Sequence, residues 1–537
     1  MYNPGLVKSG QMVRDLSPQS MLAQVRSHIA NVLGLLSGIF AIFCLLVLPM
    51  PWNTRIPLYL TVAIWTGLRP RVALYLLPIA VPWGSLDTLD VSGLNLTSSD
   101  ILVGLFAASW LAGLVLRSSA AKTHPLPGPL DRTTLKESMP TYLIFALLLL
   151  LFAMLVSMVG TFSMQASLKE IIKWLEFLAV VLLGTQYLRS RRQIWTLVTI
   201  LFLAAISQAC YGYAQYFLNL GPQAFVRDAS LRVYGTFGQP NPFAGYMNMT
   251  LTIATALMLL GKDWATRILA GATALLLGIA EYLSQSRGGE IAITIAILFI
   301  VTLGIPRLRP LMATGAIAIL GVVAGYLGGI VPERLLMPIL RILGLVQLSF
   351  TSPNPQDYAT AERLAHWIAG INIFLAHPIT GVGIGNYPNV YPQYYITIFV
   401  NALGHAHNYY INIAAETGVV GLTAFLLFLT AVFVAGSHSY RAVSRKYLQV
   451  KVQRAKPKAA MSETEMRRTL HLLKVLTNDR ALAIGLLAAL LSVFVHNMVD
   501  DLYVHSMTNL FALLLILLIR LEGVTSNVAS NGGRLDY

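Results

Sequence analysis

Long runs of apolar residues recur along this chain and narrow its fold more than any other feature. Ile29–Met50, Tyr142–Val159 and Ala481–Val495 are three of them, and they approach or exceed the roughly 20 residues that span a bilayer. Hydrophobic residues make up 56% of the chain and charged residues 11%, whereas soluble domains carry roughly 25% charged residues. The pattern predicts an all-α polytopic membrane protein.

The apolar segments give an expected count of 12–14 transmembrane helices. The count is a range because the short second and third segments form either a tight hairpin around Arg69-Pro70-Arg71 or one broken element. The expected spans lie near residues 31–50, 56–68, 72–83, 100–116, 141–160, 170–188, 193–217, 243–261, 265–283, 290–304, 310–330, 409–436, 481–499 and 505–520.

Basic residues between the spans predict the orientation of the chain. Residues 437–480 hold eleven Lys and Arg against three acids, and residues 189–193, 261–267 and 306–310 are also basic. If the spans alternate, these four segments share one side, which the positive-inside rule makes cytoplasmic. Both termini are then cytoplasmic. This distribution accounts for the net charge of +15, so we expect no nucleic-acid partner.

One long extracytoplasmic loop dominates the expected organisation. Its aromatic residues, its turns and its low charge predict an ordered loop, and apolar residues at helical spacing predict an amphipathic helix over 361–378 that lies against the membrane domain. The expected parts are a cytoplasmic N-terminus (1–30), a first transmembrane region (31–330), the loop (331–408), a membrane helix (409–436), a basic cytoplasmic loop (437–480), a final helix pair (481–521) and a cytoplasmic tail (522–537).

Three arginines on the expected outer side are candidate ligands for phosphate. They are Arg232, Arg287 and Arg363. Any one of them could simply reach the lipid headgroups, but guanidinium groups bind phosphates bidentately, and two of them could hold a diphosphate. Gly288 and Gly289 follow Arg287, and such glycines let a backbone approach a ligand or another helix.

His407 is a candidate general base at the point where the loop re-enters the membrane. Histidine is the side chain best suited to accept a proton near neutral pH, although a histidine here could also cap a helix or satisfy a buried carbonyl. His405 and His407 could form a metal pair, but no acidic or cysteine partner is near in sequence, so we expect no metal. Asp500 and Asp501, between the last two spans, could form an acidic site, but solvated turn residues are the favoured interpretation.

Several motifs in order resemble the O-antigen ligase and polymerase superfamily of bacterial envelope glycosyltransferases. They are RVYGTFGQPNPFAGY, SQSRGGE, R-x-x-x-W from Arg363 to Trp367, H-P-x-x-G-x-G-x-x-N, H-N and E-x-G-x-x-G. The resemblance covers roughly residues 140–520, with its core at about 230–435.

The resemblance implies a glycosyltransferase C-like fold with a large periplasmic loop, in the bacterial cytoplasmic (inner) membrane. It implies transfer of a glycan from an undecaprenyl-diphosphate carrier to a glycan, lipid or protein acceptor, by a metal-independent inverting reaction without cofactors. Arg287, Arg363 and His407 match the catalytic positions of the family. The expected substrate-binding residues are Arg232, Trp367, Asn408 and Tyr409.

A membrane transporter is the alternative function. The RVYGTFGQPN…SRGG portion also resembles cyanobacterial membrane proteins once proposed as bicarbonate transporters, which lack the H-N element present here at His407 and Asn408. A transporter is expected to carry charged or polar residues deep within several spans, and the apolar segments contain few. Ligase and polymerase activity are both open, because no motif encodes the acceptor.

Overall fold

The computed structural model describes most of the chain beyond residue 51. The described residues are 52–86, 88–91, 94–120, 139–227, 230–332, 349–353, 358–454 and 462–530, with isolated positions between residues 26 and 44. Most of the expected N-terminus (1–30), half of the first span (31–50) and the end of the expected tail (531–537) lie outside them.

The described residues are almost entirely helical, which confirms the all-α polytopic class. The longer helices are α2 (Trp52–Leu68), α3 (Arg71–Trp83), α4 (Ser98–Ala120), α6 (Thr141–Ser157), α7 (Met164–Tyr187), α8 (Arg191–Phe217), α9 (Pro240–Leu260), α10 (Trp264–Leu283), α11 (Arg287–Gly304), α12 (Arg309–Leu327), α14 (Tyr358–Ala376), α16 (Tyr409–Arg454), α17 (Glu463–His496) and α18 (Met507–Ser530). The short helix α15 covers Tyr387–Val390.

Two short antiparallel hairpins accompany the helices. The first pairs β1 (Thr88–Val91) with β2 (Leu94–Thr97), and the second pairs β3 (Val226–Arg227) with β4 (Ser230–Leu231).

Ten of the helices in the described part of the chain are long and apolar enough to cross a membrane: α4, α6, α8, α9, α10, α11, α12, α16, α17 and α18. The remaining expected spans beyond residue 51 correspond to α2, α3 and α7. The second and third expected spans are separate helices, because α2 ends at Leu68 and α3 begins at Arg71.

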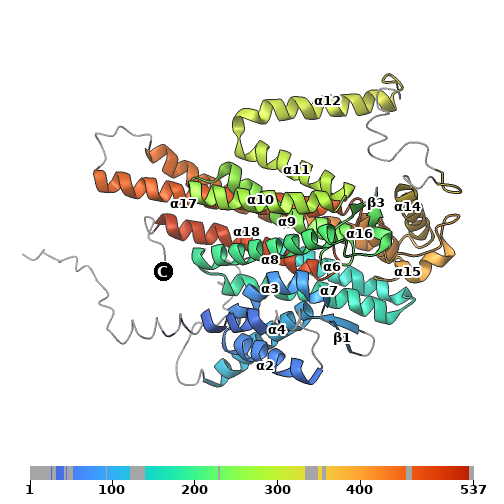
Figure 1. The fold of residues 1–537 in the computed structure, drawn as a ribbon, viewed down its shortest axis with the longest axis horizontal. Helices are drawn as coiled ribbons and strands as arrows, with labels where there is room; N and C mark the ends of the chain where they lie inside the picture. The colour runs from blue at the N-terminus through green and yellow to red at the C-terminus, as the bar shows by residue number, and fades with distance from the viewer. Residues whose placement is uncertain are drawn as a thin grey trace, which may run out of the picture.

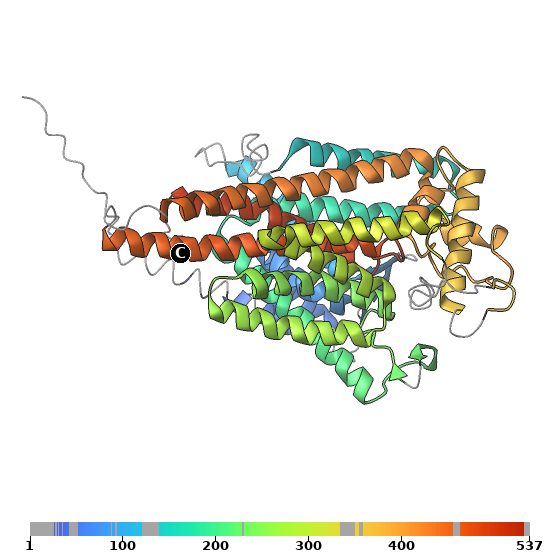
Figure 2. The same cartoon turned by 90° about the horizontal axis from the view of Figure 1, so that it is seen from above.

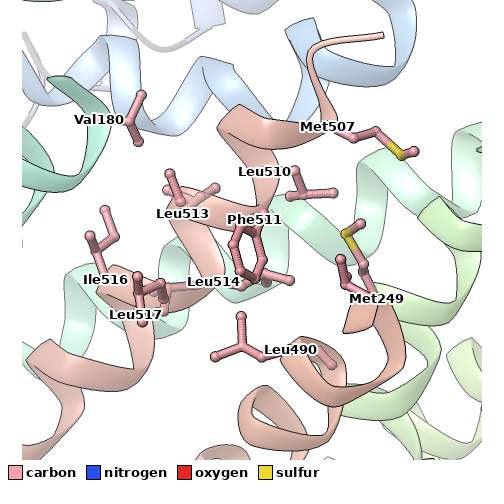
Figure 3. Close-up of a cluster of buried hydrophobic side chains, with 14 of the residues drawn as sticks. Val180, Met249, Leu490, Met507, Leu510, Phe511, Leu513, Leu514, Ile516 and Leu517 are labelled. Atoms are coloured by element: carbon pink, nitrogen blue, oxygen red, sulfur yellow. The ribbon is translucent and has the colours of Figure 1, made fainter. Parts of the chain in front are cut away.

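Helix α18 lies in the core of the bundle. Its side chains from Leu510 to Leu518 are all buried. Figure 3 shows Phe511 of α18 surrounded by apolar side chains that include Val180 of α7, Met249 of α9 and Leu490 of α17. Helix α12 is the opposite case, because none of its membrane-spanning window is buried, and it stands apart from the bundle (Figure 1). Such an exposed apolar helix suits contact with lipid.

The prediction of a loop over residues 437–480 was wrong, because most of these residues are helical. Helix α16 continues to Arg454 and α17 begins at Glu463, so both extend beyond the rest of the bundle (Figure 2). Ser462 begins α17 with a capping box, and Val450 packs against Leu476 of α17. Hydropathy marks where a helix leaves lipid, but it does not mark where the helix ends.

The expected amphipathic helix in the long loop is confirmed as α14, which lies across the end of the bundle (Figure 2). Ala361, Ala365, Ala369 and Ile373 recur every four residues and are fully buried, because residues at this spacing share one face of a helix. We call the end of the bundle that carries α14 and α15 the loop end.

Candidate functional site

The segment after α14 is fixed to a break in α16. Gly418 interrupts that helix with φ 64° and ψ −165°, a conformation that essentially only glycine adopts. The amide of Val419 donates to the carbonyl of Pro378 over 2.8 Å, and the amide of Gly383 donates to the carbonyl of Glu416 over 2.9 Å. Gly383 of the H-P-x-x-G-x-G-x-x-N motif and Gly418 of the E-x-G-x-x-G motif therefore lie at one joint between the two segments.

Asn386 ties the same segment to the start of α7. Its buried amide donates to the hydroxyl of Thr161 over 2.7 Å, and its side-chain oxygen accepts from the amide of Ser163 over 2.7 Å. The amide of Tyr387 donates to the Glu416 carboxylate over 2.9 Å. These anchors hold the polar segment rigidly over the bundle, where it can position reactive side chains.

One face of α14 connects the start of α11 with the start of α16. Thr360, Arg363 and Trp367 follow one another at i, i+3 and i+7 and so share this face. An Arg287 guanidinium nitrogen donates to the Thr360 hydroxyl over 3.4 Å, and the Trp367 indole donates to the His407 carbonyl over 3.0 Å. Arg363 therefore lies between the two contacts, and Trp367 positions the His407 backbone.

Arg232 joins Arg287 and Arg363 in a group that we call the arginine cluster. Its guanidinium donates to the carbonyl of Ser284 over 3.0 Å and to the Asn241 side chain over 3.3 Å. Burial and the neighbouring guanidinium groups, above all that of Arg363, lower the pKa of Arg232 to about 10. An anion bound between these cations would relieve their mutual repulsion.

Asp500 faces both histidines of the H-x-H sequence. Its Oδ1 lies 3.6 Å from Nδ1 of His407 and 3.8 Å from Nε2 of His405. The interpretation of Asp500 and Asp501 as solvated was wrong, because they are only 3% and 7% exposed. The amide of Tyr409 donates to the Asp500 carbonyl over 3.2 Å, which holds the turn between α17 and α18 under the start of α16.

Burial and charge set the protonation states of this group. Burial lowers the pKa of His407, with Asp500 opposing and His405 adding to the effect. Burial alone would raise the pKa of Asp500, but the two histidines outweigh it and hold that pKa well below its usual range. A neutral imidazole thus faces a carboxylate at neutral pH. In the described part of the chain, His407 Nδ1 and Asp500 Oδ2 have no hydrogen-bond partner.

His405, His407 and Asp500 are also the side chains that could hold a metal ion by distance, since their ligand atoms lie within 4.8 Å of one another. The His407 amide donates to Nδ1 of His405 over 3.0 Å. A neutral His405 therefore carries its proton on Nε2, the atom that faces Asp500. This leaves two ready ligands, fewer than the three that a catalytic zinc site uses. The group is better arranged for handling protons.

Asn408 and Tyr409 are explained by local structure. The Asn408 side-chain oxygen accepts from the amides of Tyr410 and Ile411 over 3.0 and 3.1 Å, which caps the start of α16. The Tyr409 side chain is buried, with its ring 4.6 Å from that of Tyr503. The structure therefore gives Asn408 a capping contact and Tyr409 a packing position.

Two further histidines near the site gave no signal in the sequence. His366 is buried in α14, stacks on Tyr391 at 4.4 Å, and has its ring centre 5.4 Å from that of His407. Burial, together with His407 and His405, lowers the pKa of His366 to about 3. His496, at the end of α17, is also buried. A lone histidine within an apolar helix is indistinguishable from an ordinary core residue until its neighbours are known.

The glycines after Arg287 serve helix packing. A Cβ on Gly288 would lie 2.7 Å from Val499 and 3.1 Å from His496, and one on Gly289 would lie 2.9 Å from Ala244. The two glycines therefore let the start of α11 approach α9 and the end of α17. Of the two uses expected for them, the contact with other helices is the one observed.

Comparison with known protein families finds one domain in this chain. Residues 272–426 match the family model described as O-antigen ligase, and no curated protein matches the chain. The match confirms the resemblance to the O-antigen ligase and polymerase superfamily, with its general activity of glycan transfer. Arg287, Arg363 and His407 lie inside the matched range, whereas Arg232 and Asp500 lie outside it.

Proposed function

We propose, from this O-antigen ligase domain, that the protein transfers or polymerises a glycan from an undecaprenyl-diphosphate carrier onto an acceptor hydroxyl. The observation that carries the proposal is the convergence of the arginine cluster and the His407–Asp500 pair below one face of α14. The first group suits the leaving diphosphate, and the second suits the attacking hydroxyl.

The arginine cluster acts on the donor. As the bond between the sugar and the phosphate oxygen breaks, its electron pair leaves with the diphosphate, which gains negative charge. Arg287 and Arg363 stabilise that charge in a poorly hydrated place, which lowers the barrier because the interaction strengthens in the transition state. Arg232 is held by neighbouring carbonyls and completes the positive field around the diphosphate.

His407 acts on the acceptor. With Asp500 next to Nδ1, the proton of the neutral imidazole lies on that nitrogen, and Nε2 keeps its lone pair. Nε2 then accepts the proton of the attacking hydroxyl, and Asp500 stabilises the imidazolium that forms. Attack opposite the leaving diphosphate inverts the anomeric centre. The arginines neutralise the leaving group, so this reaction needs no metal.

The proposed orientation places the site on the outer face of the bacterial inner membrane. The basic extensions of α16 and α17 lie at the end of the bundle opposite to the loop end (Figure 2). The positive-inside rule assigns such an end to the cytoplasm, together with both termini. The donor glycan, the acceptor and the arginine cluster then share the periplasmic side.

The test uses purified protein in nanodiscs with an undecaprenyl-diphosphate oligosaccharide and an envelope extract as the source of acceptor. Release of the carrier is compared for wild type, Arg363→Ala and His407→Ala, with Arg467→Ala as a matched control, because Arg467 is exposed at the opposite end. We expect release by wild type and control only. No release by folded wild type with competent substrate would overturn the proposal and favour transport, which is then measured as flux in proteoliposomes.

A further inference from the structure

A pocket opens at the loop end, and its lining includes neither the arginine cluster nor His407 or Asp500. It has a volume of about 370 Å³ and lies between the β1–β2 hairpin, the first half of α7 and the turn that joins α17 to α18. Pockets of roughly 300–1,000 Å³ are typical of small-molecule sites. Its polar lining includes Asn95, Asp100, Lys169, Lys173, Glu176 and His505.

The turn between α17 and α18 borders both this pocket and the candidate site. Asp500 faces His407, whereas Tyr503 and Ser506 of the same turn line the pocket. Three residues span at most about 11 Å of extended chain, so Tyr503 lies close to Asp500. The Lys173 ammonium donates to the Tyr503 carbonyl over 2.8 Å, which fixes the turn from the pocket side.

The charges of the pocket differ from those of the arginine cluster. Three acidic side chains, of Asp100, Glu170 and Glu176, line it together with the ammonium groups of Lys169 and Lys173. Lys173 and Glu170 form an ion pair of 2.5 Å. The acidic side chains offset the two ammonium groups, so the pocket lacks the excess positive charge that suits a diphosphate and does not fit the carrier.

A sugar suits this lining better. Each sugar hydroxyl both donates and accepts hydrogen bonds, and carboxylates beside ammonium groups offer both partners. Leu96 and Ile172 supply apolar surface for the C–H faces of the ring. The hydroxyl of Ser506 donates to the Asp100 carboxylate over 3.0 Å. This contact holds the Asp100 side chain in place, where it can accept a hydrogen bond from a sugar hydroxyl.

We propose that this pocket binds a sugar unit of a carbohydrate acceptor beside the turn between α17 and α18, which carries Asp500 next to His407. The inference rests on the proposed glycan transfer, and it names the acceptor as a glycan. The reacting hydroxyl then lies with the donor at His407, and the pocket holds another sugar unit of the same acceptor, with cations around the diphosphate and mixed charges around that sugar.

The decisive variant is Asn95→Trp, which fills the pocket from the exposed side of β2. Gln165→Trp is the matched control, because Gln165 is exposed in the first turn of α7 and does not line the pocket. Two probes are titrated into full-length protein in nanodiscs: the oligosaccharide freed from its lipid carrier, and inorganic pyrophosphate. Acceptor KM and donor KM are measured in parallel.

We expect Asn95→Trp to bind the free oligosaccharide at least tenfold more weakly than wild type and Gln165→Trp, with equal pyrophosphate binding. Its acceptor KM should rise by a similar factor, with donor KM unchanged. Oligosaccharide binding equal to wild type, or absent in wild type, would overturn the pocket assignment. If Asn95→Trp binds neither probe, the Lys169→Ala variant is measured instead, because it removes an exposed ammonium group from the lining without adding bulk. Threefold weaker oligosaccharide binding by Lys169→Ala supports the assignment, and unchanged binding overturns it.

The two proposals can fail separately. A wild type that binds the oligosaccharide in this pocket but releases no carrier would contradict glycan transfer and leave a carbohydrate site. Normal carrier release with an acceptor KM that Asn95→Trp does not change would contradict the pocket assignment alone.

Discussion

Replacing Asp500 by asparagine removes the charge that faces His407 and keeps the shape of the side chain. In the proposed reaction His407 becomes an imidazolium with its Nδ1 3.6 Å from Asp500 Oδ1. Two unit charges at that distance interact by about 5 kcal/mol at an effective dielectric constant of about 20. The asparagine dipole recovers part of this energy, so we expect a loss of about 2–3 kcal/mol in the transition state, or a rate roughly 30- to 150-fold lower.

The assay is single-turnover release of the carrier, with binding of the donor lipid measured separately. Asp501→Asn is the matched control, because it changes the adjacent buried carboxyl. Burial raises the pKa of Asp501, and asparagine can still accept from the amide of Tyr503, as Asp501 does over 2.7 Å. We expect donor binding to stay within threefold in both variants and the rate to fall only in Asp500→Asn.

A rate for Asp500→Asn within threefold of wild type would refute the electrostatic role of this carboxylate. Equal losses in Asp500→Asn and Asp501→Asn would point to the integrity of the turn between α17 and α18 and would equally refute the reasoning.

Three further predictions follow from the same geometry. Burial lowers the pKa of His407, and only the neutral imidazole can act as the base, so kcat/KM should decrease only when the pH falls below about 6.5. In Asp500→Asn the imidazolium loses its facing charge, so this decrease should begin at a still lower pH. A decrease that begins at a higher pH would contradict the assignment. Arg287→Lys keeps the positive charge but loses the planar guanidinium that can donate two hydrogen bonds to a phosphate, so the rate of carrier release should drop roughly tenfold. A near-normal rate would exclude bidentate binding of the diphosphate by Arg287. Gly418→Ala would place a Cβ 2.2 Å from the Ile379 carbonyl oxygen at φ 64°; we expect a loss of about 1–3 kcal/mol of stability, and an unchanged thermal midpoint in detergent would contradict the joint.

The fold was predictable to the extent that each helix follows from its own residues. The apolar runs place the spans, and the apolar spacing in the long loop predicts the helix α14. The buried face of α14 was predicted wrongly: the large apolar side chains of Ile368, Ile371 and Leu375 are exposed, and the buried face carries Ala361, Ala365, Ala369 and Ile373. The helical structure of the basic segment 437–480 was missed for a physical reason. Its residues are polar enough to leave lipid, but no glycine or proline interrupts them between Gly436 and Pro457, so α16 continues to Arg454.

The candidate site was predictable only where a motif marks it. Arg287, Arg363 and His407 stand in recognisable motifs, and the structure places Arg287 and His407 at the two ends of one face of α14. Asp500 stands in a polar turn that resembles any solvated turn. No acidic residue lies near His405 and His407 in the sequence, but Asp500 lies next to both of them in the folded protein.

The sequence by itself determined the membrane class, the positions of the spans and the resemblance to the O-antigen ligase family, because a bilayer acts on each apolar segment separately and motifs are local. Only the tertiary structure decided the surroundings of each charge. Asp500 is buried beside His407 because the turn after α17 packs under the start of α16, and Arg232 lies near Arg363 because α14 covers the end of the bundle. Electrostatic energy depends on distance and burial, and both are set by contacts between segments far apart in the chain.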